Sequence, residues 1–459
     1  ILFIFFNLSN SYAISLSDAL SLAYKKNPEL NAERENIKAS KQDLNISKSE
    51  FLPSVTLSGT KSSQDTSKLT NQDGSNATIN DVNPRTQSIK IEQKIFQGFG
   101  GVADYEKNKI GLAVADAKLL QVEQNTLLKA VDAFSGAIFA NEKYSIYQQN
   151  LNLIERQVEM DQVRLDRGQV TLADLAQSES SLAEAEAKFI QAKNDVVTAK
   201  LNYETIIGPI SDTFQLEKDI TMNLKIPTSL EKSINLSKNS NPNLIISKLE
   251  FEQSKKDVQI AQSDLSPSAS LSFETKETDD LSSTYDQQDK ETLEATITWP
   301  IFSGGKNYAS LSKSKNLRNR KQLLYENAVK LNDSNVASAW SNLQSSKSVL
   351  EAVKLQVKAA EIANEGITAE YESGQGRSTL DVLQSNSILL DAKVSLAKSE
   401  RDYLLSQFQL LKCVGLYPQQ DTRLVLGENG NTKLNGEREA KQHAHCGGET
   451  EQHARRINK

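Results

Sequence analysis

The chain carries one long sequence pattern twice, and this duplication restricts its possible folds more than any other feature. Residues 16–59 match residues 230–273 at one constant offset, so that Asn27-Pro28 corresponds to Asn241-Pro242. Further matches follow in the same order: Pro53 with Pro267, Ile95 to Gly98 with Ile301 to Gly304, Gly168 with Gly374, Asp174 with Asp381, and Ile207-Gly208 with Val414-Gly415. A repeat of this length predicts two similar halves packed about a pseudo-symmetric axis, rather than a solenoid of short units.

Each half is expected to begin with two helices. In the first half, apolar spacing predicts a short helix at 17–26 and a second helix at 29–50. The first ends at Asn27-Pro28, because the residue before a proline disfavours the helical conformation, and the second ends before Pro53. The second half repeats both signals.

Beyond these prolines the hydrophobic period changes from 3.6 to 2, which is typical of strands. The alternating apolar positions are Val55, Leu57, Ile89 and Ile91 in the first half, and Ala269, Leu271, Phe273, Leu293, Ala295, Ile297 and Trp299 in the second. They predict four strands of roughly 10 residues, the length of a tilted strand that crosses a membrane. The polar segments 61–85 and 275–289 are expected to be exposed hairpin loops.

Two very long helices should follow the strands. The patterns at 102–166 and 306–372 contain no proline, and each would be roughly 100 Å long at 1.5 Å per residue. Such a helix needs partners along its whole length. In the first, apolar residues are spaced by three and four, as in a coiled-coil seam, at Leu127, Val131, Phe134, Ile138, Tyr147, Leu151, Ile154 and Val158. Returning helices at 172–207 and 379–414 would complete two helical hairpins.

Four strands are too few to close a barrel, and an open sheet edge in lipid would leave its N–H and C=O groups without partners. Several chains must therefore share one barrel, and three chains would supply 12 strands, an even number within the known range. The predicted fold class is mainly α with a β-barrel portion. It has duplicated halves, long antiparallel helices that form a trimeric α-barrel, and four strands per chain that contribute to a shared 12-stranded transmembrane β-barrel.

Composition agrees with this fold. The 459 residues are 38% hydrophobic and 24% charged, yet no apolar run after the first residues reaches the roughly 18 that a membrane helix needs. Residues 1–13, ILFIFFNLSNSYA, are similar to the apolar core and cleavage site of a secretory signal, so the mature chain is expected to begin near Ile14. The formal net charge of -6 gives no basic footprint for nucleic acid.

An enzymatic function is not expected. All three histidines and one of the two cysteines lie near the end of the chain, at His443, His445, Cys446 and His453, so the repeated body has no imidazole base or ligand. The His443 to Cys446 cluster could be a metal site. However, residues 430–459 lack apolar periodicity, and an unstructured charged tail is the better interpretation. No catalytic residue, metal site or cofactor is therefore predicted.

Taken in order, these motifs resemble those of the TolC family of outer-membrane efflux and secretion proteins. The paired Asn-Pro segments, the Ile-Phe-x-Gly turns before the long helices, and the hairpin tips at 164–175 and 371–383 carry the resemblance, which covers about residues 14–430. It implies a homotrimer in the outer membrane of a Gram-negative bacterium, in contact with outer-membrane lipid and extending into the periplasm. The duct would be a passive conduit of a tripartite efflux pump or a type I secretion system. Its partners would be a periplasmic adaptor, or membrane fusion protein, and an inner-membrane transporter.

The resemblance also places the functional residues at the helical tips. The positions that correspond to the family's entrance gate are Asp174, Tyr371, Arg377 and Asp381. Arg377 offers a planar fork that suits a carboxylate, and the hypothesis is that it links to Asp174 across neighbouring helix pairs. The alternative is a solvated ion pair with little effect on stability.

Three tip positions correspond to those that contact adaptors in the family, namely Gly168, Val170 and Gly374. The chain departs from the family pattern in two ways. One residue is inserted between Gly374 and Arg377, and Gln384 stands where relatives carry a second acidic residue. The reduced charge at the gate weakens the expectation of strong cation sensitivity.

The predicted organisation has five parts: a signal-peptide remnant at 1–13, a first repeat at 14–208, a linker or equatorial segment at 209–229, a second repeat at 230–415, and a C-terminal equatorial segment with a disordered tail at 416–459. The strand hairpins are expected at about 54–96 and 268–302, and the long helical hairpins at about 102–207 and 306–414. The alternative function is a periplasmic coiled-coil adaptor or scaffold without a pore. The strands discriminate between the two, because an adaptor would not carry two membrane hairpins at equivalent points of a duplicated helical frame.

Overall fold

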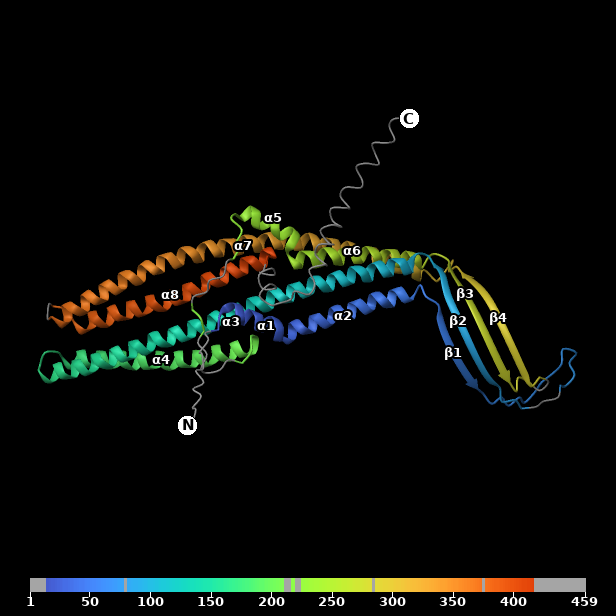
Figure 1. Cartoon of the computed structure of the whole chain (residues 1–459), viewed down its shortest axis with the longest axis horizontal. Coiled ribbons are helices and arrows are strands. Elements are labelled where there is room, and N and C mark those ends of the chain that lie inside the picture. Colours follow the sequence, from blue (N-terminus) through green and yellow to red (C-terminus); the bar gives the residue numbers. More distant parts are fainter. Residues whose placement is uncertain are drawn as a thin grey trace, which may run out of the picture. The chain divides into compact units, whose positions relative to one another are not determined.

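The computed structural model describes residues 14–77, 81–209, 216–218, 224–282, 285–373 and 376–416. Its elements in chain order (Figure 1) are α1 (Leu16–Lys26), α2 (Pro28–Ser49), β1 (Ser54–Lys61), β2 (Arg85–Gln97), α3 (Gly100–Asp166), α4 (Leu172–Ile206), α5 (Leu230–Ser240), α6 (Pro242–Ser263), β3 (Ser268–Asp279), β4 (Gln287–Thr298), α7 (Lys306–Glu372) and α8 (Thr379–Val414). The predicted helices are confirmed, with ends displaced by two residues at most. None of the helices in the described ranges has an apolar stretch long enough to cross a bilayer.

The chain divides into two compact units, and each unit takes segments from both halves of the sequence. The first draws on Ile1–Asn27, Gln124–Ser233 and Ser338–Lys459, and the second on Pro28–Glu123 and Ile234–Ala337. The helical tips belong to the first unit and the sheet to the second. The expected signal remnant lies outside the described residues, as do Gly374 and the tail with His443, His445, Cys446 and His453.

The second unit contains one antiparallel sheet with the strand order β1-β2-β3-β4. Its register places Val55 opposite Ile91, Ile91 opposite Phe273, and Phe273 opposite Leu293, so one row of apolar side chains crosses all four strands. These side chains are exposed, Val55 by 67% and Leu293 by 71%. The predicted four strands and their alternation are confirmed, and β1 and β4 are the two edges of the sheet. The predicted loop at 275–289 is wrong at both of its ends, because strand pairing continues to Asp279 in β3 and begins at Gln287 in β4.

A sharp bend joins β2 to α3 in the second unit. Gly98 has φ +56° and Phe99 φ +64°, in the left-handed region that glycine adopts without strain. A Cβ atom on Gly98 would lie 2.5 Å from Cβ of Ser266 and 2.9 Å from the carbonyl oxygen of Ser263. Glycine is therefore required here both for the backbone conformation and for the close approach of the segment that ends α6.

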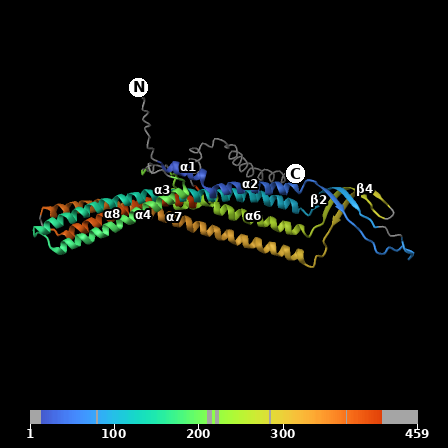
Figure 2. The same cartoon turned by 90° about the horizontal axis from the view of Figure 1, so that it is seen from below.

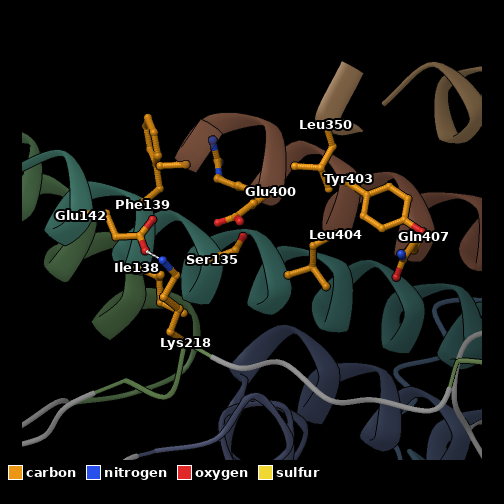
Figure 3. Close-up of a pocket in the computed structure, with 12 residues that line it drawn as sticks. Ser135, Ile138, Phe139, Glu142, Lys218, Leu350, Glu400, Tyr403, Leu404 and Gln407 are labelled. Carbon is orange, nitrogen blue, oxygen red and sulfur yellow. Dashed lines mark ion pairs between the residues drawn. The ribbon is translucent and has the colours of Figure 1, made fainter. Parts of the chain in front are cut away.

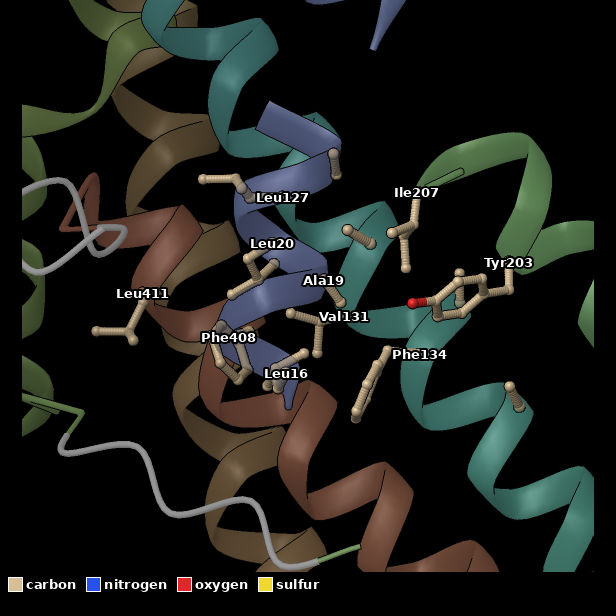
Figure 4. Packing of buried hydrophobic residues seen from close by; sticks show 14 residues of the cluster. Leu16, Ala19, Leu20, Leu127, Val131, Phe134, Tyr203, Ile207, Phe408 and Leu411 are labelled. Atoms are coloured by element: carbon tan, nitrogen blue, oxygen red, sulfur yellow. The ribbon is translucent and has the colours of Figure 1, made fainter. Parts of the chain in front are cut away.

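The first unit has an apolar core where α1, α3, α4 and α8 meet (Figure 4). Phe134 of α3, Tyr203 of α4 and Phe408 of α8 are all fully buried, and the rings of Phe134 and Tyr203 lie 6.5 Å apart between centroids. Burial of one large apolar side chain stabilises a fold by about 1.5–3 kcal/mol. This core holds together helices that are distant in the sequence.

Away from this core, the first unit consists of two helical hairpins. The C-terminal part of α3 runs antiparallel to α4, and that of α7 runs antiparallel to α8, as both views show (Figures 1 and 2). Gly168, with φ +70°, lies in the turn of the first hairpin. The chain reverses direction here because glycine tolerates this left-handed conformation after the end of a helix.

Candidate functional site

The helices α4 and α8 begin with the same kind of cap, and each cap involves one of the predicted gate residues. Thr171 caps α4, and its backbone N–H and hydroxyl both donate to the Asp174 carboxylate at 2.8 and 2.7 Å. Ser378 caps α8 and donates to Asp381 at 2.9 and 2.8 Å in the same way. These hydrogen bonds, from the backbone first and the hydroxyl second, lower the pKa of both carboxyl groups below the ordinary value of 3.8. Both aspartates are therefore the reciprocal partners of a capping box.

Arg377 is paired within its own chain. Its Nε donates to the Glu370 carboxylate at 2.6 Å, and both side chains are more than 40% exposed. An exposed pair of this kind contributes about 0–1 kcal/mol to stability. The hypothesis that Arg377 links to Asp174 across neighbouring helix pairs stays a prediction.

A cleft of about 580 Å³ lies between the two hairpin tips. It brings together three of the four predicted gate residues and one of the predicted docking positions. Its lining consists of Arg164, Gln169, Val170, Asp174, Tyr371, Glu372, Ser373, Arg377, Ser378 and Thr379. Asp381 and Gly168 are not part of this lining.

A buried carboxylate lies next to this cleft, and the sequence analysis did not identify it. Asp161 of α3 is fully buried and accepts four hydrogen bonds. Gln157 donates to both of its oxygens at 3.0 Å, Ser178 of α4 donates at 2.6 Å, and the Tyr371 hydroxyl of α7 donates at 2.9 Å. A carboxylate can take all of these donors at once, since it is an acceptor only. The buried charge is thus well satisfied.

Tyr371 is the residue through which this group reaches the second hairpin. Its ring is 8% exposed, and the guanidinium carbon of Arg164 lies 4.3 Å from the ring centroid, a cation–π geometry. Its hydroxyl also lies 3.0 Å from Oγ1 of buried Thr379, the first residue of α8. Because the single Tyr371 proton goes to Asp161, the Thr379 hydroxyl is the donor in this second bond.

One sequence signal could have identified Asp161. It lies seven residues after Ile154, on the apolar seam that also contains Leu151 and Val158. A carboxylate at a coiled-coil seam position needs buried partners, so it marks a polar network between helices. Ser178 interrupts the apolar face of α4 in the same way, three residues after Leu175.

A second cavity of about 290 Å³ lies in the first unit, among α3, α7, α8 and Lys218 (Figure 3). Its walls combine apolar side chains such as Phe139 and Leu404 with charged ones. Lys218 pairs with Glu142, and the Arg401 guanidinium donates to Asp132 at 2.6 Å. Within the described ranges, no group of three His, Cys, Asp or Glu side chains is placed to hold a metal ion.

Comparison with known proteins assigns the architecture to one family. A sequence model of the family described as "Outer membrane efflux protein" matches residues 19–209 and 233–416, which is most of the chain. The two matched segments correspond closely to the two halves of the duplication.

Individual relatives support the same assignment. The outer membrane efflux protein BepC of Brucella suis is 26% identical over 403 residues, 87% of this chain and 85% of that protein. The alkaline protease secretion protein AprF of Pseudomonas aeruginosa is 21% identical over 423 residues, 91% of this chain and 87% of that protein. The crystal structure of the Campylobacter jejuni CmeC outer membrane channel superposes with a TM-score of 0.79 at 17% identity, covering 90% of this chain and 88% of that one.

Proposed function

Because this chain belongs to the outer membrane efflux protein family, we propose that three copies of it form one duct whose entrance lies at the α3/α4 and α7/α8 tips. The TolC-family resemblance is confirmed, and the protein is an outer-membrane exit duct of an efflux pump or secretion system that extends into the periplasm. The stoichiometry, the gate residues and the docking surface are the proposed parts.

The sheet is the observation that supports the proposed trimer. Its outer strands, Ser54–Lys61 and Gln287–Thr298, have no further strand beside them among the described residues. An apolar row crosses one face, which suits contact with lipid, while edges without partners cannot remain in lipid. Pairing β4 of one chain with β1 of the next satisfies both edges, and three chains give the 12 strands expected from the sequence. A fully folded, stable monomer in detergent would contradict this proposal.

The cleft at the tips supports the proposed gate. Asp174, Tyr371 and Arg377 lie around one space between the two hairpins, and Asp381 lies in the first turn of α8, outside the lining of this space. Contacts between these hairpins restrain helices that must separate before cargo can pass. The observation that carries the proposal is therefore the position of Asp174, Tyr371 and Arg377 between the hairpins, rather than on the outer surface of one.

The gate can be tested by single-channel recording in planar bilayers. Arg377→Ser combined with Tyr371→Phe should raise conductance while the yield of trimer stays the same. Glu370→Gln is the matched control, because it removes the charge of the partner of Arg377 within the chain and leaves Arg377 itself in place. If Glu370→Gln alone reproduces the double variant, Arg377 acts only on Glu370. If conductance is unchanged throughout, neither Arg377 nor Tyr371 restrains the entrance.

The charge of Asp381 provides a second test of the proposed gate. Three Asp381 carboxylates would face the entrance of a trimer, so Asp381→Ala should weaken any block by multivalent cations. Ser378→Ala is the control, because it disturbs the same cap and keeps the carboxylate. An unchanged block in Asp381→Ala would remove Asp381 from the entrance.

Docking to a periplasmic adaptor and an inner-membrane transporter is proposed at the same tips. Gly168 is exposed and Val170 is half-buried at the turn of the first hairpin, where a partner can reach them. A bulky side chain at 170, such as Val170→Trp, should block transport in cells without changing conductance in bilayers. The adaptor alternative is disfavoured, because the family match and the two strand hairpins both belong to a duct.

A further inference from the structure

The hydrogen-bond network around Asp161 separates two kinds of contact. Ser178 lies on α4 and Gln157 on α3, so their bonds to Asp161 stay within the first hairpin. Tyr371 lies on α7, so its bond to the same carboxylate joins the second hairpin to the first. The buried Asp161 carboxylate thus stabilises the first hairpin internally and also binds the second hairpin to it.

Asp174 does not take part in this attachment. Its carboxylate oxygen accepts from the backbone and the side chain of Thr171, three residues earlier on the same tip. Tyr371 lines the same cleft as Asp174, but its hydroxyl is directed to Asp161 at 2.9 Å. The structure therefore separates the carboxylate that caps α4 from the carboxylate that binds the tyrosine.

We propose that Asp161, rather than Asp174, is the carboxylate that holds Tyr371 and keeps the two helical hairpins of each chain together at the entrance. This inference rests on the proposed gate and names the residue that positions Tyr371 within it. Asp161 acts through Tyr371 and does not contact the cargo, because it is fully buried.

Two successive hydrogen bonds connect the two hairpins. The Thr379 hydroxyl donates to the oxygen of Tyr371, and Tyr371 donates to Asp161, so the first residue of α8 is connected through α7 to α3. Any movement of the α7/α8 hairpin away from α3/α4 breaks the bond between Tyr371 and Asp161. A hydrogen bond to a buried charge is among the stronger ones in a protein, and its loss should shift the ratio of open to closed entrances by about tenfold.

The test is a double-mutant cycle on the full protein in planar bilayers. Tyr371→Phe and Asp161→Asn should each raise the open-to-closed ratio, because the first removes the bond between the two residues and the second removes the charge that strengthens it. The double variant should open no more than the stronger single variant, because both act on the same bond. Additive effects would overturn the proposal. So would an Asp161→Asn channel that gates like the parent.

Two matched variants separate positioning from general destabilisation. Ser178→Ala removes a bond to Asp161 inside the first hairpin, so it should lower thermal stability and leave the open-to-closed ratio near that of the parent. The effect of Asp174→Asn on the ratio should add to that of Tyr371→Phe, because the Asp174 carboxylate accepts from Thr171 and not from the tyrosine. If the double variant instead opens no more than Tyr371→Phe alone, then Asp174 holds the tyrosine and the proposal is wrong.

Asp161→Asn could fail to assemble, and Tyr371→Phe then carries the test with Thr379→Val as its control. Thr379→Val keeps the shape of the side chain and removes a bond to Tyr371 that stays within the second hairpin, so it should leave the open-to-closed ratio near that of the parent, whereas Tyr371→Phe should raise it. Equal opening by the two variants would overturn the proposal, because the bond to Thr379 and not the bond to Asp161 would then explain the effect of the tyrosine. A parent protein that forms no conducting trimer would contradict the proposed function, whereas a conducting parent that responds to Arg377→Ser and to Tyr371→Phe but not to Asp161→Asn would contradict only the role of Asp161.

Discussion

The returning helices of the two helical hairpins begin with the same cap, but the side chains buried behind the two caps differ. Both are closed by the same capping box, with Thr171 and Asp174 in the first and Ser378 and Asp381 in the second. Both also place a buried serine four residues after the capping aspartate, Ser178 in the first and Ser385 in the second.

These two serines have different partners. Ser178 donates to the Asp161 carboxylate on α3, whereas Ser385 accepts from the neutral Asn364 amide on α7 at 3.0 Å. Counted back from the tip glycines, Asp161 corresponds to Ile367. The Asp161 carboxylate can accept more hydrogen bonds than its own hairpin donates, and the Tyr371 hydroxyl of the other hairpin donates one of them. The difference between Asp161 and Ile367 therefore has a structural effect: the carboxylate bonds both within its own hairpin and to the other hairpin.

The largest effect should come from making the first tip like the second by Asp161→Ile. The buried donors of Gln157, Ser178 and Tyr371 would then lose the Asp161 carboxylate as acceptor, at about 1–3 kcal/mol each, so the free energy of unfolding should fall by roughly 3–9 kcal/mol. Urea unfolding of the detergent-solubilised protein, followed by circular dichroism, would measure this loss. Ile367→Val is the control, with an expected loss of about 0.5–1.5 kcal/mol. Equal losses at the two positions would mean that the tips are equivalent inside as well.

A smaller difference is expected between the two serines. Ser178→Ala removes a hydrogen bond to a charged group and should lower the free energy of unfolding by about 1.5–3 kcal/mol. Ser385→Ala removes a bond to a neutral amide that also donates to Asn386 at 2.6 Å, so its cost should be about 0.5–1.5 kcal/mol. The same unfolding experiment compares them. A larger loss of unfolding free energy for Ser385→Ala than for Ser178→Ala would contradict the view that the stronger, charged hydrogen bond lies in the first hairpin.

The caps should respond alike, since they are alike in structure. Thr171→Ala and Ser378→Ala should each cost about 1 kcal/mol, the usual value for the loss of a side-chain cap. Hydrogen exchange of the amides in the first turns of α4 and α8 would show faster exchange in each variant at its own helix. An effect of Thr171→Ala on α8 would indicate that the caps communicate.

The smallest expected effect is the weakening of the two helix caps at low pH. The pKa of Asp174 and of Asp381 is lowered by hydrogen bonds from Thr171 and Ser378, so both caps contribute fully above pH 3.8 and weaken as the pH falls below it. Exchange in the first turns of α4 and α8 should therefore accelerate in parallel as the solution is acidified. In Thr171→Ala the acceleration at α4 should become shallower. Unequal acid responses in the parent would separate two caps that otherwise look identical.

Much of the fold follows from the sequence because its signals are local. Pro28 ends α1, Gly168 supplies a left-handed residue at the first tip, and the alternation around Leu293 defines β4. Each signal acts within a few residues, so its outcome does not depend on the rest of the chain. Duplication adds to this, because each half supplies an independent copy of the same pattern.

The candidate site was predicted only in part, and for a physical reason. Asp174 and Asp381 were found at the tips, but their capping role was missed although Thr171 and Ser378 precede them by three residues. The bond between Tyr371 and Asp161 joins residues 210 apart in the sequence. It depends on how each hairpin is rotated about its own axis, which apolar periodicity defines too coarsely to select one side chain.

The open edges of the four-stranded sheet have a consequence for the kinetics of biogenesis. Helical hairpins form within a single polypeptide, so the rate at which they form does not depend on how many copies are present. In the proposed trimer, by contrast, pairing of a β1 edge with the β4 edge of another copy is an encounter whose rate rises with concentration. Until that encounter, each newly made chain displays two rows of unpaired N–H and C=O groups that can capture any extended segment nearby. Slow synthesis keeps the concentration of copies low and therefore prolongs the interval in which the sheet edges of a single chain can pair with a wrong segment. Selection can act on the length of this interval.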